Sequence, residues 1–103
     1  HADSPMFPTE AFSLMQTAVT RQTASGQVLN AAQAISVRQA LRAMTINAAW
    51  QLGIEQQAGS LEVGKWADLQ IVDQSPYAVP TQRLSALTVE EVYLAGALQY
   101  RRD

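Results

Sequence analysis

The sequence contains no cysteine and a single histidine among its 103 residues. Without cysteine the chain can form neither a disulfide nor a thiolate metal site, although this does not decide its compartment. No apolar run approaches the roughly 20 residues that a membrane-spanning helix needs, and no signal peptide is visible. The formal net charge is −2 and the basic residues are scattered, apart from Arg101 and Arg102. We therefore expect neither a membrane nor a nucleic-acid partner, because clustered positive charge is missing.

The residues that are present describe an ordinary soluble globular chain. Hydrophobic residues make up 48% of the sequence and charged residues 16%, which is a typical balance. The length allows one domain at most and lies near the lower range for a sizeable core. A complete (β/α)8 barrel needs about 250 residues, so no such barrel can form from this chain alone.

Residues 59–73 carry the plainest local pattern of the sequence. Gly59 and Gly64 predict two tight turns. Apolar and polar residues then alternate over 67–73, which is typical of a half-buried strand. The expected buried face consists of Ala67, Leu69 and Ile71. This segment reads as a turn-and-strand module without catalytic groups of its own.

The part before this module is expected to be helical. Pro8 and Thr9 form a helix-start signal with Thr9 as the cap, and an apolar stripe predicts a helix over about 10–22. Gly26 can end that region with a left-handed turn.

A second helical region is predicted over about 37–52, as two short helices or as one helix kinked at Thr45. Ser36 and Gln39 fit a capping box, in which each side chain accepts a hydrogen bond from a backbone amide. Gly53 supplies the stop signal at the end.

The part after the module is expected to contain a β-hairpin. Residues 89–93 and 97–101 alternate on either side of Leu94-Ala95-Gly96, and Gly96 can adopt the positive φ of a tight turn. Glu90 and Glu91 are predicted to form a charged edge that discourages the addition of another strand.

Three segments together resemble a known family. Gly59-Ser-Leu-Glu-x-Gly-Lys-x-Ala-Asp-Leu69, with the apolar strand and Asp73 after it, is similar to a segment near the C-terminus of metal-dependent amidohydrolases. Residues 45–53 resemble the helix that precedes it there, and His1-Ala-Asp3-Ser-Pro5 resembles the last active-site motif of the barrel. The resemblance is to the YtcJ-like branch, of which some members carry the label exoenzyme regulatory protein. It covers nearly the whole chain and keeps the family's order and spacing.

The resemblance implies an α+β fragment of a larger enzyme. Residues 1–53 would be the last active-site loop and closing helices of a truncated (β/α)8 barrel. Residues 54–103 would be the C-terminal part of the small antiparallel β-domain. The expected partners are the remainder of the amidohydrolase chain and a small-molecule substrate.

The resemblance also implies the chemistry. The parent enzyme would hydrolyse C–N bonds of non-peptide amides with a water activated by a divalent metal, expected to be zinc. Asp3 matches the motif's aspartate, which binds the metal and accepts a proton from the water, as a hard anionic ligand and base can do. In the isolated chain the alternative is a solvated loop aspartate, with His1 inert, Ser4 no nucleophile, no bound cofactor and no activity.

Other residues are given structural interpretations. Trp50 and Trp66 are expected to pack rather than to form a ligand platform. Lys65 and Asp68 could form an ion pair or grip a ligand, but the resemblance implies structural roles, and an exposed pair would contribute only ~0–1 kcal/mol.

Two further expectations follow from the sequence. A stand-alone regulatory or protein-interaction module without enzymatic activity is the alternative function. Strand edges and apolar helix faces that lack their partners in the larger enzyme favour self-association, so we expect a homo-oligomer. The localisation is left open.

Overall fold

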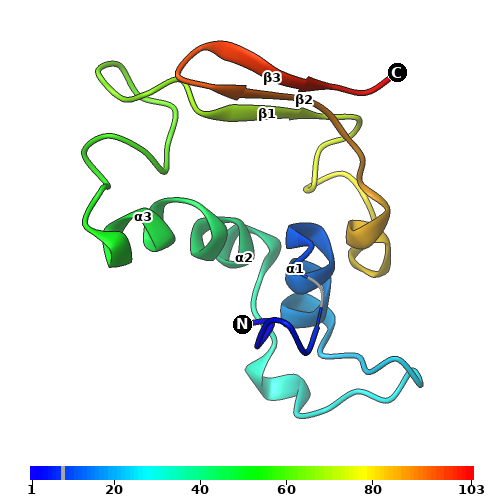
Figure 1. Cartoon of the computed structure of the whole chain (residues 1–103). Coiled ribbons are helices and arrows are strands. Elements are labelled where there is room, and N and C mark those ends of the chain that lie inside the picture. The colour runs from blue at the N-terminus through cyan, green and yellow to red at the C-terminus, as the bar shows by residue number, and fades with distance from the viewer. Residues whose placement is uncertain (8) are drawn as a thin grey trace. The chain divides into compact units, whose positions relative to one another are not determined.

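The computed structural model describes residues 1–7 and 9–103, so the prediction for Pro8 lies outside the described residues. The described part is an α+β structure with helices and an antiparallel sheet, as expected (Figure 1). Its elements in chain order are α1 (Ala11–Thr20), η1 (Ala31–Gln33), α2 (Val37–Met44), α3 (Ile46–Leu52), β1 (Leu69–Val72), η2 (Thr81–Ala86), β2 (Val89–Leu94) and β3 (Ala97–Arg101), where η denotes a 3₁₀ helix.

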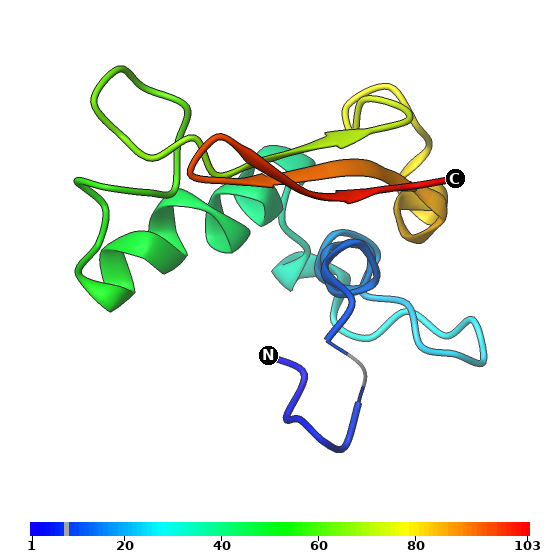
Figure 2. The same cartoon turned by 45° about the horizontal axis from the view of Figure 1, so that its top comes forward.

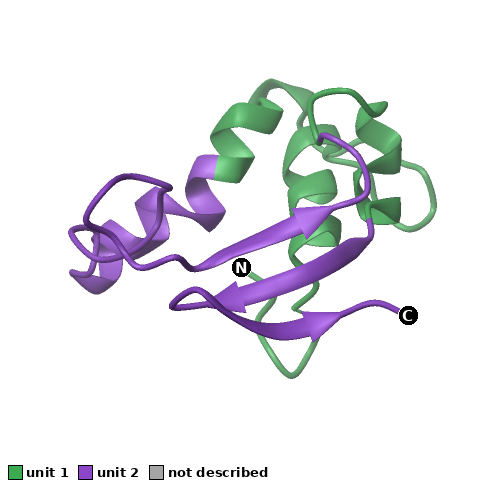
Figure 3. Ribbon diagram, turned by 90° about the horizontal axis from the view of Figure 1, so that it is seen from above, with its two compact units in different colours: residues 1–41, 76–87 green, residues 42–75, 88–103 purple. Residues whose placement is uncertain are grey.

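The chain divides into two compact units (Figure 3). Residues 1–41 and 76–87 form unit 1, and residues 42–75 and 88–103 form unit 2. The predicted division between 1–53 and 54–103 concerns the origin of each part in a larger enzyme, and it stays a prediction.

Helix α1 confirms the first predicted helix but has different ends. Glu10, not Thr9, occupies the N-cap position. The helix ends at Arg21, whose φ of 56° is left-handed and whose N–H donates to the Thr17 carbonyl at 2.8 Å. Gly26 does adopt a positive φ of 89°, but in a separate turn after the helix has ended.

The core of unit 1 lies between α1 and η2. Met15 of α1 is 2% exposed and Leu84 of η2 is fully buried. Gln16 Oε1 accepts a hydrogen bond of 2.8 Å from the Ser85 backbone N–H. Figure 2, in which α1 is seen nearly end-on, shows η2 beside it. The sequence did not predict η2, because so short a helix has too few residues to display a period.

The predicted pair of helices is confirmed, with the break at Thr45 between α2 and α3. The capping box is present: the Gln39 N–H donates to Ser36 Oγ at 3.1 Å, and the Ser36 N–H donates to Gln39 Oε1 at 2.9 Å. Gly53 has the expected left-handed φ of 74° at the end of α3.

The sheet belongs to unit 2 and has the order β1-β2-β3, with both neighbouring pairs antiparallel. Strands β2 and β3 confirm the predicted hairpin. Ala95 and Gly96 form its turn, and both have positive φ, at 50° and 79°. Two such residues match the right-handed twist of the strands that they join.

Two predictions about the sheet are wrong. Strand β1 spans only Leu69–Val72, and Ile71 on its expected buried face is 47% exposed. The strand is shorter because the Ala67 carbonyl and the Asp68 carboxylate both accept backbone N–H groups of the hairpin turn. Glu90 and Glu91 do not form an edge, because β2 is the central strand and has a neighbour on each side.

Candidate functional site

The predicted catalytic residue, Asp3, lies in an irregular N-terminal segment of unit 1. It is exposed and has a left-handed φ of 51°. Its backbone carbonyl accepts the Met6 N–H at 2.8 Å, which closes a turn. Ala2 beside it is only 8% exposed, so the segment is fixed on one side while the carboxylate-bearing residue remains accessible.

The described residues do not complete a metal site around Asp3. Over residues 1–7 and 9–103, no three or more His, Cys, Asp or Glu side chains come close enough to hold a metal ion. His1 and Ser4 are exposed, and a mononuclear zinc centre in an enzyme takes three protein ligands. A single carboxylate can supply one ligand at most, so no hydrolytic step can be derived from these residues alone.

The loop between α3 and β1 is closed by Lys65, whose side chain is only 12% exposed. Its Nζ donates to Ser60 Oγ at 2.8 Å and lies 3.1 Å from Glu62 Oε2. Ser60 Oγ in turn donates to Glu62 at 2.5 Å. The Ser60 hydrogen bond, followed by the hydrogen bond and charge of Lys65, lowers the pKa of Glu62 below its ordinary value. The three side chains therefore hold the loop rather than a ligand.

Lys65 and Asp68 both have structural roles, as expected, and they bond different partners. Asp68 Oδ1 instead accepts the backbone N–H of Ala95 at 2.8 Å and so ties the start of β1 to the hairpin turn. The sequence could not reveal this bond because the two residues are 27 positions apart.

Both tryptophans depart from the prediction that they pack. Trp50 is 72% exposed and Trp66 is 53% exposed. Trp50 lies on a groove of about 590 Å³ within unit 2, which sequence reasoning missed. Residues that line it include Arg42, Asn47, Trp50, Glu55, Val63 and Lys65. The sequence placed Trp50 on an apolar stripe, which does not show whether anything covers that face.

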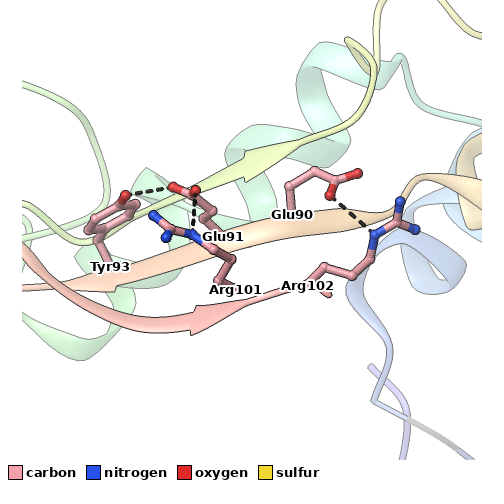
Figure 4. A network of polar contacts seen from close by, with 5 residues as sticks. All are labelled: Glu90, Glu91, Tyr93, Arg101 and Arg102. Atoms are coloured by element: carbon pink, nitrogen blue, oxygen red, sulfur yellow. Dashed lines mark hydrogen bonds and ion pairs between the residues drawn. The ribbon is translucent and has the colours of Figure 1, made fainter.

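A charged network lies on the hairpin (Figure 4). The Tyr93 hydroxyl donates to Glu91 at 2.5 Å, and Arg101 Nε donates to the other oxygen of Glu91 at 3.0 Å. Arg102 forms a separate ion pair of 3.1 Å with Glu90. The Tyr93 hydrogen bond is the first cause that lowers the pKa of Glu91, and the same bond raises the pKa of Tyr93. Because each charge meets an opposite charge across the strands, the network stabilises the sheet and offers no unpaired catalytic group.

Among the described residues, none of the helices has the length and apolar character of a membrane span.

Two features of the described residues bear on function: the Asp3 segment in unit 1 and the groove in unit 2.

The model of the amidohydrolase family matches residues 1–100. The chain belongs to the amidohydrolase family. An N-substituted formamide deformylase from Arthrobacter pascens is 37% identical over 101 residues, which are 98% of this chain and 19% of that relative. An imidazolonepropionase from Thermoplasma volcanium is 39% identical over 64 residues, which are 62% of this chain and 16% of that relative.

Two solved structures show the same fold. An amidohydrolase from Thermotoga maritima matches 97% of this chain and 22% of its own, with a TM-score of 0.72 and 29% identity. An adenosine deaminase from Xanthomonas campestris with bound zinc matches 95% of this chain and 24% of its own, with a TM-score of 0.63 and 29% identity. The chain thus spans about a fifth of the length of the relatives that it matches.

Proposed function

We propose that this chain is the C-terminal portion of a metal-dependent hydrolase that cleaves C–N bonds of non-peptide amides. The family match over residues 1–100 carries this proposal. The helices and the three-stranded sheet, which have the fold of two solved relatives, support it. The 103 residues alone are expected to be inactive, because no group of three potential metal ligands comes together among the described residues. Membership of the YtcJ-like branch stays a prediction.

The proposed substrate is a small N-substituted formamide, which water would convert to formate and an amine. The deformylase relative supports this choice, because the similarity extends over 98% of this chain. The similarity to the imidazolonepropionase extends over only 62%, so a cyclic imidazolone is the weaker candidate.

Asp3 is the residue that we propose for the metal site and for accepting the proton of the attacking water. An exposed carboxylate can serve as a hard ligand and as a base. The other ligands would come from polypeptide outside these 103 residues. Zinc is proposed because the relative from Xanthomonas campestris contains it.

The test uses the native gene product with its own N-terminus and metal content. Formate release from N-butylformamide is measured for the wild type, Asp3→Asn and the control Glu10→Gln. We expect Asp3→Asn to lower kcat by about 100-fold or more, as loss of a proton-accepting group does, and Glu10→Gln to change little. Metal analysis should find zinc in the wild type. Full activity of Asp3→Asn would overturn the role of Asp3, and a metal-free wild type would overturn the metal-dependent mechanism.

We also propose that the isolated chain self-associates through its sheet. Strands β1 and β3 are the outer strands, and every residue of β3 is exposed. Unpaired strand edges favour pairing with another chain. Sedimentation equilibrium of the purified 103-residue chain should show a dimer or higher oligomer, and a monomer at high concentration would contradict this.

A further inference from the structure

The N-terminal segment that contains Asp3 also carries two large apolar side chains, Met6 and Phe7. Met6 is 69% exposed, which is the highest value for a large apolar side chain in the described part of unit 1. Phe7 beside it is 60% exposed. Apolar surface in water is unfavourable, and a bound apolar group would relieve this cost.

A turn brings Met6 close to Asp3. The Asp3 carbonyl accepts the Met6 N–H at 2.8 Å, and residues joined in this way have Cα atoms within about 7 Å of each other. Ala2, which is 8% exposed, fixes the start of the segment, while every residue from 3 to 7 is exposed. The proposed metal-binding residue and the two apolar residues are therefore accessible together.

The proposed reaction places one particular part of the substrate beside this turn. Because Asp3 is proposed to accept the proton of the attacking water, a hydrogen bond of about 3 Å joins its carboxylate to that water. The water attacks the formyl carbon, and the nitrogen that carries the substituent is bonded to this same carbon. The substituent thus begins close to Asp3 and within reach of side chains in the same turn.

The residues that follow Asp3 favour an apolar substituent. None of residues 4–7 has a charged side chain, so a charged group would lose hydration there without gaining an ion pair. Pockets for small molecules are lined mainly by apolar and aromatic side chains. Methionine is flexible and adapts to groups of different shape, and phenylalanine contributes a large apolar ring. An alkyl or aryl group fits this pair of side chains best.

We propose that Met6 and Phe7 bind the apolar N-substituent of the substrate and make the enzyme prefer formamides with longer alkyl chains. In this assignment Met6 and Phe7 determine specificity, whereas Asp3 takes part in the chemical step. The inference rests on the proposed function, because it requires the substrate to react beside Asp3.

The test compares N-methylformamide and N-butylformamide as substrates of the full-length gene product. Each buried methylene should raise kcat/KM by about fourfold, so the wild type should prefer N-butylformamide by a factor of up to about 60. Met6→Ala and Phe7→Ala should each reduce this preference at least about fivefold, while kcat/KM for N-methylformamide stays within about twofold.

Two control variants separate specificity from a structural role. Met6→Leu keeps a large apolar side chain and should keep the preference. Val28→Ala changes another apolar side chain of unit 1, which is 52% exposed, and should leave the preference unchanged. A wild type without the preference, or alanine variants at positions 6 and 7 that keep it, would overturn the proposal. An equal loss of kcat/KM for both substrates would overturn it too, because it indicates a structural role.

A binding measurement separates this inference from the proposed function. Titration calorimetry gives the dissociation constants of n-butylamine and methylamine, which carry the same substituents as the two substrates. We expect n-butylamine to bind more tightly than methylamine, and Met6→Ala to weaken its binding about fivefold. This result in a protein that releases no formate would overturn only the proposed function. Formate release with the same preference in the wild type and both alanine variants would overturn only this inference, and the absence of both formate release and chain-length-dependent binding would overturn both.

Discussion

Residues 1–7 and residues 54–68 both lack regular secondary structure, yet the chain holds them very differently. The later segment is fixed at both ends: the Ile54 N–H donates to the Ala49 carbonyl at 2.9 Å, and the Gly96 N–H donates to the Ala67 carbonyl at 3.0 Å. Its middle is closed by Lys65. The first segment has the turn from Asp3 to Met6 and leaves Met6 and Phe7 more than half exposed, at 69% and 60%.

Residues 54–68, which include the part of the sequence with the clearest pattern, are held by contacts within their own unit. Glycines, a lysine whose side chain is 12% exposed and an aspartate that accepts a distant N–H are all used within unit 2. The chemically interesting carboxylate of Asp3 lies instead where the described chain provides little support. A catalytic group needs its surroundings to be positioned to within a fraction of an ångström, so a functional Asp3 requires further polypeptide.

The largest loss of stability is expected from Gly59→Ala, which changes a residue within the 54–68 segment. Gly59 has a φ of 94°, and an added Cβ would lie 2.6 Å from the Ala49 Cβ and 3.0 Å from the Ile46 Cα. Left-handed strain of roughly 1–2 kcal/mol and overpacking of roughly 1–3 kcal/mol add up to a loss of about 3 kcal/mol in the free energy of unfolding. Denaturant unfolding measures this loss.

Gly64→Ala is the matched control for that substitution. Gly64 has nearly the same φ, 96°, but an added Cβ would meet nothing within 4 Å. Only the conformational strain remains, so we expect a loss of about 1 kcal/mol. Equal losses for the two alanine variants would show that contact with α3 does not matter.

A smaller effect is expected from Asp68→Ala. This substitution removes the acceptor for the Ala95 N–H, which joins the 54–68 segment to the hairpin. The expected loss in the free energy of unfolding is about 1 kcal/mol, the net contribution of an ordinary hydrogen bond. Asp68→Asn keeps an acceptor oxygen and should lose less. An alanine variant as stable as the asparagine variant would contradict the structural role of this bond.

The structure explains which features could be predicted from the sequence. The helices, the capping box and the Ala95-Gly96 turn depend on residues close together in the chain, and local patterns were sufficient for them. The bond from Asp68 to Ala95 joins distant residues and left no local trace. The exposure of Trp50 was unpredictable for another reason: an apolar stripe shows which face is apolar, but not whether anything covers it.

The hairpin network gives a third prediction, which concerns pH. The hydrogen bond from Tyr93 is the largest single cause that lowers the pKa of Glu91, and the hydrogen bond and charge of Arg101 lower it as well. Tyr93→Phe and Arg101→Gln should therefore each raise the pKa of Glu91 toward its ordinary value. Carboxyl ¹³C NMR titration measures both shifts.

The sign of the effect on stability follows from the direction of that pKa. Because the folded state lowers the pKa of Glu91, its stabilisation is complete above the unfolded pKa and disappears as the pH falls through the folded value. Wild type and Tyr93→Phe should thus differ near neutral pH and converge in acid. A difference that grows in acid would contradict this assignment.

The smallest effect on stability is expected from Asp3→Asn, and this completes the comparison of the two segments. Asn tolerates the left-handed φ of 51° as well as Asp does, and the hydrogen bond to Met6 uses the backbone carbonyl, which the substitution keeps. The free energy of unfolding should change by less than about 0.5 kcal/mol, as for an ordinary surface substitution. Thermal unfolding and turnover are measured on the same sample of the full-length protein. A large loss of turnover without a loss of stability would show that Asp3 has a catalytic role, in contrast to the structural role of Asp68. A large loss of stability would instead contradict this and show that Asp3 stabilises the fold.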